Sequence, residues 1–394
     1  MKLSMNKPNT RLTGAAVAVC GIGLILCRIA VADPSLGGPV LGVKPSLAQL
    51  NLINCDDTNF LYVVQTSTNL QDWKSVQTNS AAPSGSTIYA FATNTSCFYR
   101  LMVISNVPQP LFNYAILTRS NINLNGNNVI IDSFDSSNPL YSTQGQYDPA
   151  KRKAGGDIAT VSSVVGDINV GNANIFGSIF TGPGTVEFAV QIGSGGVVGD
   201  IAWNSGNQGI EPGHWAGDLI VNLPDVQTPT FSGDALPAPV SGVITLNGGF
   251  YTSPTNPAAA FNITGPTTLW IQGTFSPGNI AIATTNSASL VVYVGTAGNS
   301  VDTLNLANTT NGMNLPGFAT NLQFYGLPSV SNIMFSATRG FVGSVYAPGA
   351  DATISGGGTN QSLVCGALIV KSITMNSHPN LHFDENLRVA GPTR

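Results

Sequence analysis

The segment between Phe341 and Val370 contains a six-residue stretch that returns after 23 residues. The first copy runs from Val342 to Ala347 and the second from Cys365 to Val370, while a looser echo links residues 353–356 with 374–377. Each copy alternates apolar and small residues between Gly, Pro or Asn, which is typical of a short strand between turns. Self-similarity at roughly 20 to 50 residues predicts stacked repeats, and strands this short favour a β-solenoid over a helical array.

Similar sequence segments occur far upstream, at an offset of 46 residues from each other. Residues 121–124 match residues 167–170, and residues 176–180 resemble residues 342–346. We interpret the offset as two turns of 23 residues. The spacings predict one coil geometry from about residue 113 to residue 388, in an all-β chain.

Charged residues make up only 9% of the 394 residues, against about 25% in ordinary soluble domains. Hydrophobic residues make up 43% and alternate along the chain, which excludes general disorder. The net charge of −4 and the lack of basic clusters argue against a nucleic-acid partner. Neutral polar turns with little charge favour an extracellular β-protein.

The first 32 residues have the features of a secretory signal peptide. Basic residues precede an apolar run from Gly14 to Cys27, and Ala30-Val31-Ala32 forms a small-x-small cleavage site before Asp33. The apolar run is too short to cross a bilayer comfortably. We therefore expect a secreted or cell-surface protein, periplasmic or extracellular, with no membrane span after cleavage between Ala32 and Asp33.

Export would place the three remaining cysteines in an oxidising compartment. Cys55 and Cys97 bracket one small module, so we expect a disulfide between them. Cys365 lies in a repeat strand between Val364 and Gly366, where we expect a buried, unpaired thiol. A catalytic cysteine would need a nearby base, and no motif around Cys365 supplies one.

Turn-rich segments divide the chain after the signal peptide. We expect a leader at 33–48, a small β-sandwich module at 49–107, a linker at 108–112, the solenoid at 113–388 and a C-terminal tail at 389–394. Four prolines between Pro224 and Val240 exclude central strands there, so this stretch should cross the surface.

Two parts of the chain resemble known families. Residues 64–73 and Phe98-Tyr99-Arg100 resemble a small β-sandwich module that serves as an accessory in large bacterial secreted proteins. Residues 131–136, 156–160, 322–327, 345–348 and 383–385 resemble, in order, a domain of unknown function in bacterial surface and pilus-associated proteins. The second resemblance implies a right-handed parallel β-solenoid and no established activity. The sequence of the predicted coils also resembles, more weakly, polymer-forming bacterial solenoids and solenoid ice-binding adhesins.

Four sets of residues invite a chemical role, and for each a structural role is the preferred interpretation. His378 and His382, followed by Asp384, suggest a metal site, but positions i and i+4 of a strand lie about 13 Å apart. We expect these residues in a polar terminal coil that caps the solenoid. One further set is a carboxylate ladder for Ca²⁺ at four Gly-Asp steps, which comprises Asp157, Asp167, Asp200 and Asp218. Another is an acid/base pair of Asp132 and Asp135, and the last is a groove arginine, Arg119 or Arg339.

The sequence therefore predicts a secreted, non-enzymatic structural or adhesive protein with no catalytic residue, no metal and no cofactor. Its partners would be a cell-surface polymer, a pilus or another surface protein, and self-association is open. Two alternatives remain at this point. One is a glycan- or ice-binding solenoid with a regular polar face, and the other is a polysaccharide-active β-helix enzyme with carboxylates in a groove.

We predict that the exported protein begins at Asp33. Signal peptidase recognises small residues at the positions that Ala30 and Ala32 occupy. Intact-mass measurement of the exported chain should show the loss of residues 1–32. A secreted chain that retains them would contradict the assignment.

Overall fold

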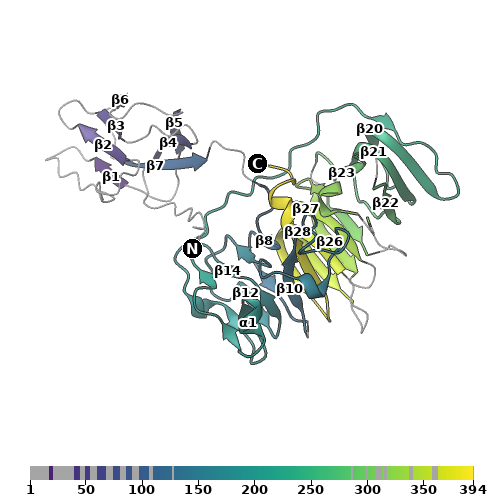
Figure 1. Ribbon diagram of the computed structural model, residues 1–394. Coiled ribbons are helices and arrows are strands. Elements are labelled where there is room, and N and C mark those ends of the chain that lie inside the picture. The colour runs from purple at the N-terminus through teal and green to yellow at the C-terminus, as the bar shows by residue number, and fades with distance from the viewer. Residues whose placement is uncertain are drawn as a thin grey trace. The chain divides into compact units, whose positions relative to one another are not determined.

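The computed structural model describes residues 110–393, apart from positions 127, 285–286, 299, 308–312, 315–316, 337–339 and 357–362, and seven strands before residue 110. The chain divides into two compact units (Figure 1). The first comprises residues 1–109 with Arg394, and the second comprises Pro110–Thr393. The boundary falls within the predicted 108–112 linker. Among the residues that the structure describes, no helix is long and apolar enough to cross a bilayer.

The first unit contains two antiparallel sheets. One has the order β1 (Val17–Cys20), β7 (Cys97–Ser105), β4 (Phe60–Ser67) and β5 (Lys74–Asn79). The other has the order β2 (Val40–Lys44), β3 (Gln49–Ile53) and β6 (Ser86–Ala90). Strand β2 lies within the predicted leader, and β1 lies within the predicted signal peptide. Cleavage after Ala32 would remove this edge strand and leave three strands in the first sheet.

The second unit is a parallel β-solenoid whose coils build three parallel sheets. The first sheet runs through β18 (Trp215–Ala216), β14 (Ile179–Phe180), β11 (Ile158–Thr160), β8 (Ile116–Thr118), β28 (Leu363–Met375), β27 (Phe341–Ser355), β25 (Leu322–Gly326), β23 (Ser289–Val294), β21 (Ala260–Ile271), β20 (Val243–Ser253) and β19 (Asp234–Ala235). The long strands β20, β21, β27 and β28 continue around a corner and contribute to a second sheet.

The other two sheets share this coil order. The second sheet contains β15 (Gln191–Ile192), β12 (Ile168–Gly171), β9 (Ile122–Asn123), the ends of β28 and β27, β26 (Val330–Ser336) and β24 (Asp302–Leu306). The third contains β17 (Gly209–Ile210), β16 (Val197–Gly199), β13 (Asn174–Phe176), β10 (Ile130–Phe134), β29 (Asn380–Asp384), the starts of β28 and β27, β22 (Ile280–Ile282), and the starts of β21 and β20.

Helices in this unit are single turns. They are α1 (Ile201–Asn204) and the 3-10 helices η3 (Pro149–Lys151), η4 (Glu187–Ala189), η5 (Ala319–Asn321) and η6 (Glu385–Arg388). The all-β parallel solenoid predicted from the sequence is therefore confirmed.

The last coil of the chain lies in the middle of the stack. Strand β28 pairs with β8 and β9 of the first coil, and β29 pairs with β10 over five residue pairs. Figure 1 shows the yellow C-terminal strands beside the blue β8 and β10. The prediction that the coil around His382 caps the solenoid is therefore wrong. The stack has two halves, and the first and last coils of the chain join them.

The repeat of 23 residues corresponds to adjacent coils. Val345 lies opposite Leu368 and Thr353 lies opposite Thr374, as the two echoes predicted. The interpretation of the 46-residue offset as two turns is wrong, because Ile122 lies directly opposite Ile168. These residues are one coil apart, and the loop formed by residues 135–157 accounts for the added length of that coil.

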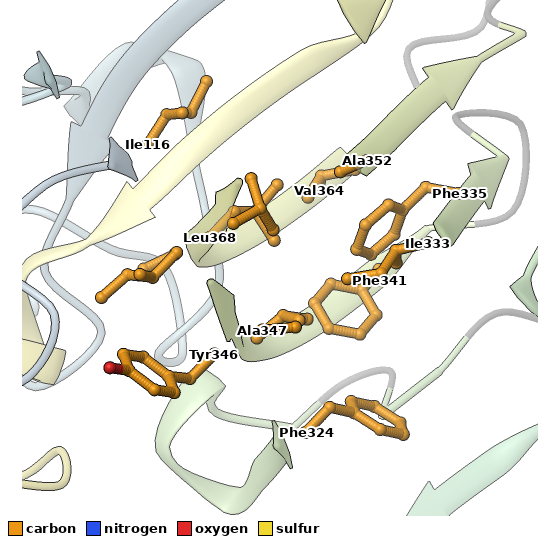
Figure 2. Close-up of a cluster of buried hydrophobic side chains, with 14 of the residues drawn as sticks. Ile116, Phe324, Ile333, Phe335, Phe341, Tyr346, Ala347, Ala352, Val364 and Leu368 are labelled. Carbon is orange, nitrogen blue, oxygen red and sulfur yellow. The ribbon is translucent and has the colours of Figure 1, made fainter. Parts of the chain in front are cut away.

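Stacked aliphatic and aromatic side chains fill the space between the three sheets (Figure 2). Val345, Leu368 and Ile116 occupy successive coils in register and are each fully buried. The glycines of the repeat permit this spacing. A Cβ on Gly366 would lie 1.7 Å from the carbonyl oxygen of Gly343, and the φ of Gly366 is +136°. No side chain fits there, so the Gly343–Gly366 pair is a steric requirement of the stack.

We predict that Leu368→Ala destabilises the solenoid by about 2–5 kcal/mol, since it leaves a cavity between Val345 and Ile116. Equilibrium urea unfolding of the purified chain measures this free energy. Leu140→Ala is the matched control, because Leu140 is 73% exposed and its truncation should cost less than about 0.5 kcal/mol. Similar values for the two variants would contradict the stacking role of Leu368.

Candidate functional site

A row of apolar side chains runs along the outward face of the first sheet. One outward position is occupied on successive coils by residues that lie opposite one another in register: Trp270, Tyr293, Tyr325, Tyr346, Ile369, Leu117, Ala159 and Phe180. We call this set the outward row. Apolar side chains in register on a solvent-facing sheet surface favour a covering segment, because burial of apolar area stabilises the folded chain.

The covering segment is the stretch from residue 217 to residue 233, which we call the crossing segment. It joins β18 at one end of the first sheet to β19 at the other, so it runs the length of that sheet. Eleven strands about 4.8 Å apart span roughly 48 Å, and an extended chain of this length reaches about 60 Å. The surface path predicted for residues 224–240 therefore agrees with an extended course of the crossing segment, which contains Pro224 and Pro229.

Polar and apolar contacts fix the crossing segment on the sheet. Leu219, Leu223 and Val226 are buried against the core. The hydroxyl of Tyr346 donates a hydrogen bond of 2.6 Å to the carbonyl oxygen of Pro224. Arg119 donates to the carbonyl of Leu223 and forms an ion pair of 2.7 Å with Asp225. Arg119 is therefore an anchor for the segment.

Beyond Val226 the crossing segment and the sheet border an open groove of about 580 Å³. Residues 227–231 form one wall, and the floor carries Phe250, Thr268, Val291, Tyr293, Gln323 and Tyr325. Phe231 closes one side, with its ring centroid 5.1 Å from that of Phe250 and 6.4 Å from that of Tyr293. We refer to this site as the strap groove.

The strap groove is electrically neutral. No Asp, Glu, Lys, Arg or His lines it. Burial raises the pKa of Tyr325, with a further contribution from its neighbours Tyr293 and Tyr346, and burial also raises the pKa of Tyr293. Both tyrosines therefore remain protonated at neutral pH. The Tyr325 hydroxyl donates to the Gln323 amide oxygen at 3.1 Å.

A second cluster of polar residues lies on the third sheet under the loop formed by residues 135–157. Asp132, His382 and Cys365 occupy successive coils in register. Oδ1 of Asp132 forms a short contact with His382 Nδ1. The Tyr147 hydroxyl donates a hydrogen bond of 2.6 Å to Oδ2 of Asp132. The Tyr147 ring stacks on His382 with centroids 3.6 Å apart. No sequence motif indicated a base near Cys365, but the register places His382 directly opposite it.

This cluster is buried, and its chemistry suits anchoring. Asp132, His382 and Cys365 are each at most 3% exposed. Burial raises the pKa of the Cys365 thiol well above its usual value, with Asp384 and Asp132 adding to the effect, so the thiolate that a nucleophile requires is disfavoured. Cys365 is a free, buried thiol, in agreement with the sequence analysis.

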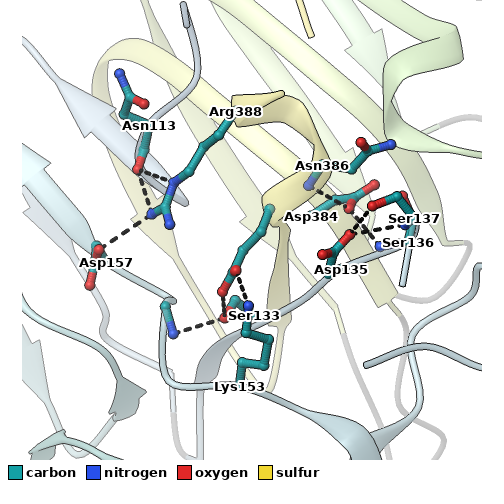
Figure 3. A network of polar contacts seen from close by, with 12 residues as sticks. Asn113, Ser133, Asp135, Ser136, Ser137, Lys153, Asp157, Asp384, Asn386 and Arg388 are labelled. Atoms are coloured by element: carbon teal, nitrogen blue, oxygen red, sulfur yellow. Dashed lines mark hydrogen bonds and ion pairs between the residues drawn. The ribbon is translucent and has the colours of Figure 1, made fainter. Parts of the chain in front are cut away.

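Charged residues beside the cluster tie the loop and the last coil together (Figure 3). Glu385 accepts from Ser133 at 2.8 Å and forms a short ion pair with Lys153. Asp384 accepts from the backbone N–H groups of Ser136 and Asn386. Burial raises the pKa of Asp384, although these hydrogen bonds oppose the shift.

The Gly-Asp steps do not form a ladder for Ca²⁺. Asp157 accepts from the backbone of Ser178 and lies 3.4 Å from Arg388. Burial raises its pKa, against the opposing charge of Arg388. Asp200 caps α1, and Asp167 accepts from Ser162. Within the described part of the chain, no three His, Cys, Asp or Glu residues are arranged to hold a metal ion.

The other residue pairs that the sequence suggested, Asp132 with Asp135 and His378 with His382, do not form common sites. Asp135 bonds to Ser137, whereas Asp132 bonds to His382 and Tyr147, so the two aspartates are not paired. His378 is exposed and precedes β29, while His382 is buried within it. The side chains of Cys55 and Cys97, the Ala32–Asp33 cleavage site and Arg339 lie outside the described residues.

Sequence reasoning missed the strap groove. Two of its aromatic residues, Tyr293 and Tyr325, belong to the outward row, in which the steps from Trp270 to Tyr293, Tyr325 and Tyr346 are uneven. The sequence contains two features that could have indicated the groove, namely apolar residues at outward strand positions and a proline-rich segment that could cover them. To combine them, one must know which strands are neighbours, and this depends on the lengths of the loops between the coils.

A family model described as a domain of unknown function, DUF7305, matches residues 222–390. This range begins within the crossing segment and contains the half of the solenoid that carries the strap groove. The likeness of the C-terminal region to a domain of unknown function is therefore confirmed there. No curated protein and no solved structure matches the chain.

We predict that Tyr147→Phe destabilises the solenoid by about 1–3 kcal/mol, because it leaves a buried oxygen of Asp132 without its donor. Tyr141→Phe in the same loop is the control. Tyr141 is 38% exposed, and loss of its hydroxyl should change the free energy of unfolding by less than about 0.5 kcal/mol. Urea unfolding compares the two, and equal effects would contradict the anchoring role of Tyr147.

Proposed function

We propose that this protein is secreted and acts without catalysis as an adhesive protein at the cell surface. The observation that carries the proposal is the strap groove, which is open, neutral and rich in aromatic and hydroxyl groups. Such a lining suits binding through van der Waals contacts and hydrogen bonds. It offers no pair of carboxylates for general acid and base catalysis.

The architecture supports the same proposal. Adjacent coils share continuous backbone pairing, and the crossing segment ties both halves of the stack together. A scaffold of this kind holds surface residues at fixed spacings. The first unit would then serve as an accessory module, in keeping with its resemblance to modules of secreted bacterial proteins. A cell-surface polymer is the proposed partner, and association with a pilus is a further proposal from the second resemblance.

The ice-binding alternative draws less support from the structure. The outward face of the second sheet carries Asn169, Asn123, Thr374 and Thr353 in register. Met334 interrupts this row on the next coil, and the Lys371–Asp351 ion pair lies beside it. A regular ladder of Thr, Ser or Ala is therefore not continued across the sheet.

Cells that export the full chain should carry it on their surface and attach to polymer-coated supports more strongly than cells without it. Protease accessibility on intact cells measures the first property, and counts of retained cells under flow measure the second. Purified protein should leave the polymer length unchanged in size-exclusion chromatography. Retention inside the cell, or shortening of the polymer, would contradict the proposal, and shortening would favour the polysaccharide-active alternative.

A further inference from the structure

The floor of the strap groove has the length and openness that an extended polymer requires. Its central row consists of Phe250, Thr268, Val291 and Gln323, which lie opposite one another on four consecutive coils. Coils about 4.8 Å apart make this row roughly 14 Å long. The volume of about 580 Å³ falls within the range of built ligand sites. The site can therefore hold several units of a chain that runs along the solenoid.

The lining excludes a charged chain. A polymer with carboxylate, sulfate or phosphate groups would place charges against threonine, glutamine and aromatic side chains. No cation in the groove would pair with them, and burial of an unpaired charge is costly. An uncharged chain carries no such penalty, so neutrality in the groove selects for neutrality in the ligand.

Two kinds of groups are accessible to the ligand. Phe250 is 54% exposed, and its ring offers an apolar surface at one end of the floor. The hydroxyls of Thr228, Thr230 and Thr268 form no hydrogen bond with any described residue. Apolar ring surface beside free hydroxyls complements a sugar unit, which has C–H faces and hydroxyl edges.

The floor of the groove does not present the backbone groups with which a peptide strand would pair. Its floor is the side-chain face of a sheet, and the backbone groups of that sheet pair between coils. A peptide that adds a strand needs an unpaired sheet edge. We propose that the strap groove binds a neutral polysaccharide chain lying along the solenoid, an inference that rests on the proposed adhesive function and names its ligand.

Affinity electrophoresis of the native chain in gels that contain a soluble polysaccharide tests the assignment. Neutral β-glucan, mannan and galactomannan serve as probes, and alginate and polygalacturonate serve as charged comparators. At least one neutral polymer should retard the protein, and neither charged polymer should do so. Retardation by the charged polymers alone, or by none of the five, would overturn the proposal.

Two variants with matched controls locate the binding. Phe250→Ala should weaken the affinity about tenfold, because it removes the exposed aromatic surface on which a sugar unit would pack. Thr268→Val removes a hydroxyl at nearly constant volume and should weaken it several-fold. Phe188→Ala, at a site 85% exposed away from the groove, and Thr353→Val, on the second sheet, should leave the affinity unchanged. Equal effects of groove and control variants would overturn the assignment to the strap groove.

The result separates this inference from the broader proposal. A protein that promotes cell attachment but shows no groove-dependent retardation refutes the polysaccharide site and leaves adhesion through another surface. A protein that binds a neutral polysaccharide through the groove yet stays inside the cell supports the site and refutes the adhesive function. Binding of a peptide or protein at the groove in place of the polysaccharides would also overturn the inference.

Discussion

Backbone pairing between the first and last coils is the contact on which the rest of the solenoid depends. Strands β28 and β29 complete hydrogen-bonded ladders with β8, β9 and β10, so neither coil leaves an open edge in the middle of the stack. This closure has a topological consequence. Because the chain enters and leaves the solenoid at its centre, it must travel once from one end of the stack to the other. The crossing segment is that passage.

The position of the crossing segment follows from burial of apolar area. Ile369, Leu117 and Ala159 point outward on the first sheet yet are almost fully buried, which a solvated sheet face does not explain. The segment supplies Leu219, Leu223 and Val226 as their cover. The segment is still bound to the sheet at Tyr346, and the groove lies beyond it, over Tyr325 and Tyr293. The strap groove is therefore a product of closure and passage.

The third sheet shows how a familiar set of residues can serve a structural purpose. Cysteine, histidine and aspartate on consecutive coils match the composition of a nucleophilic triad, but geometry and access decide the chemistry. Tyr147 lies flat on His382 and the loop covers the cluster, so the groups hold the loop to the last coil. The ion pair and hydrogen bonds of Glu385 extend the same attachment. A long insertion within one coil is thereby kept in a defined place.

The sequence by itself determined the elements of this protein that depend on local pattern. The alternation in residues 342–347 and 365–370, with their fixed spacing, was enough to predict parallel coils and the pairing of Val345 with Leu368. The prolines after Pro224 predicted a surface passage, because proline cannot donate within a sheet. Only the tertiary structure decided the order of the coils. Ile122 lies opposite Ile168 on the adjacent coil despite a gap of 46 residues in the sequence. His382 lies opposite Asp132, although most of the sequence of the domain separates them. The length of a loop does not change the residue pattern of the strands that it joins, but it determines which strands become neighbours in the stack. The outward row, the strap groove and the buried cluster all arise from that choice of neighbours, and so they appear only when the coils are stacked.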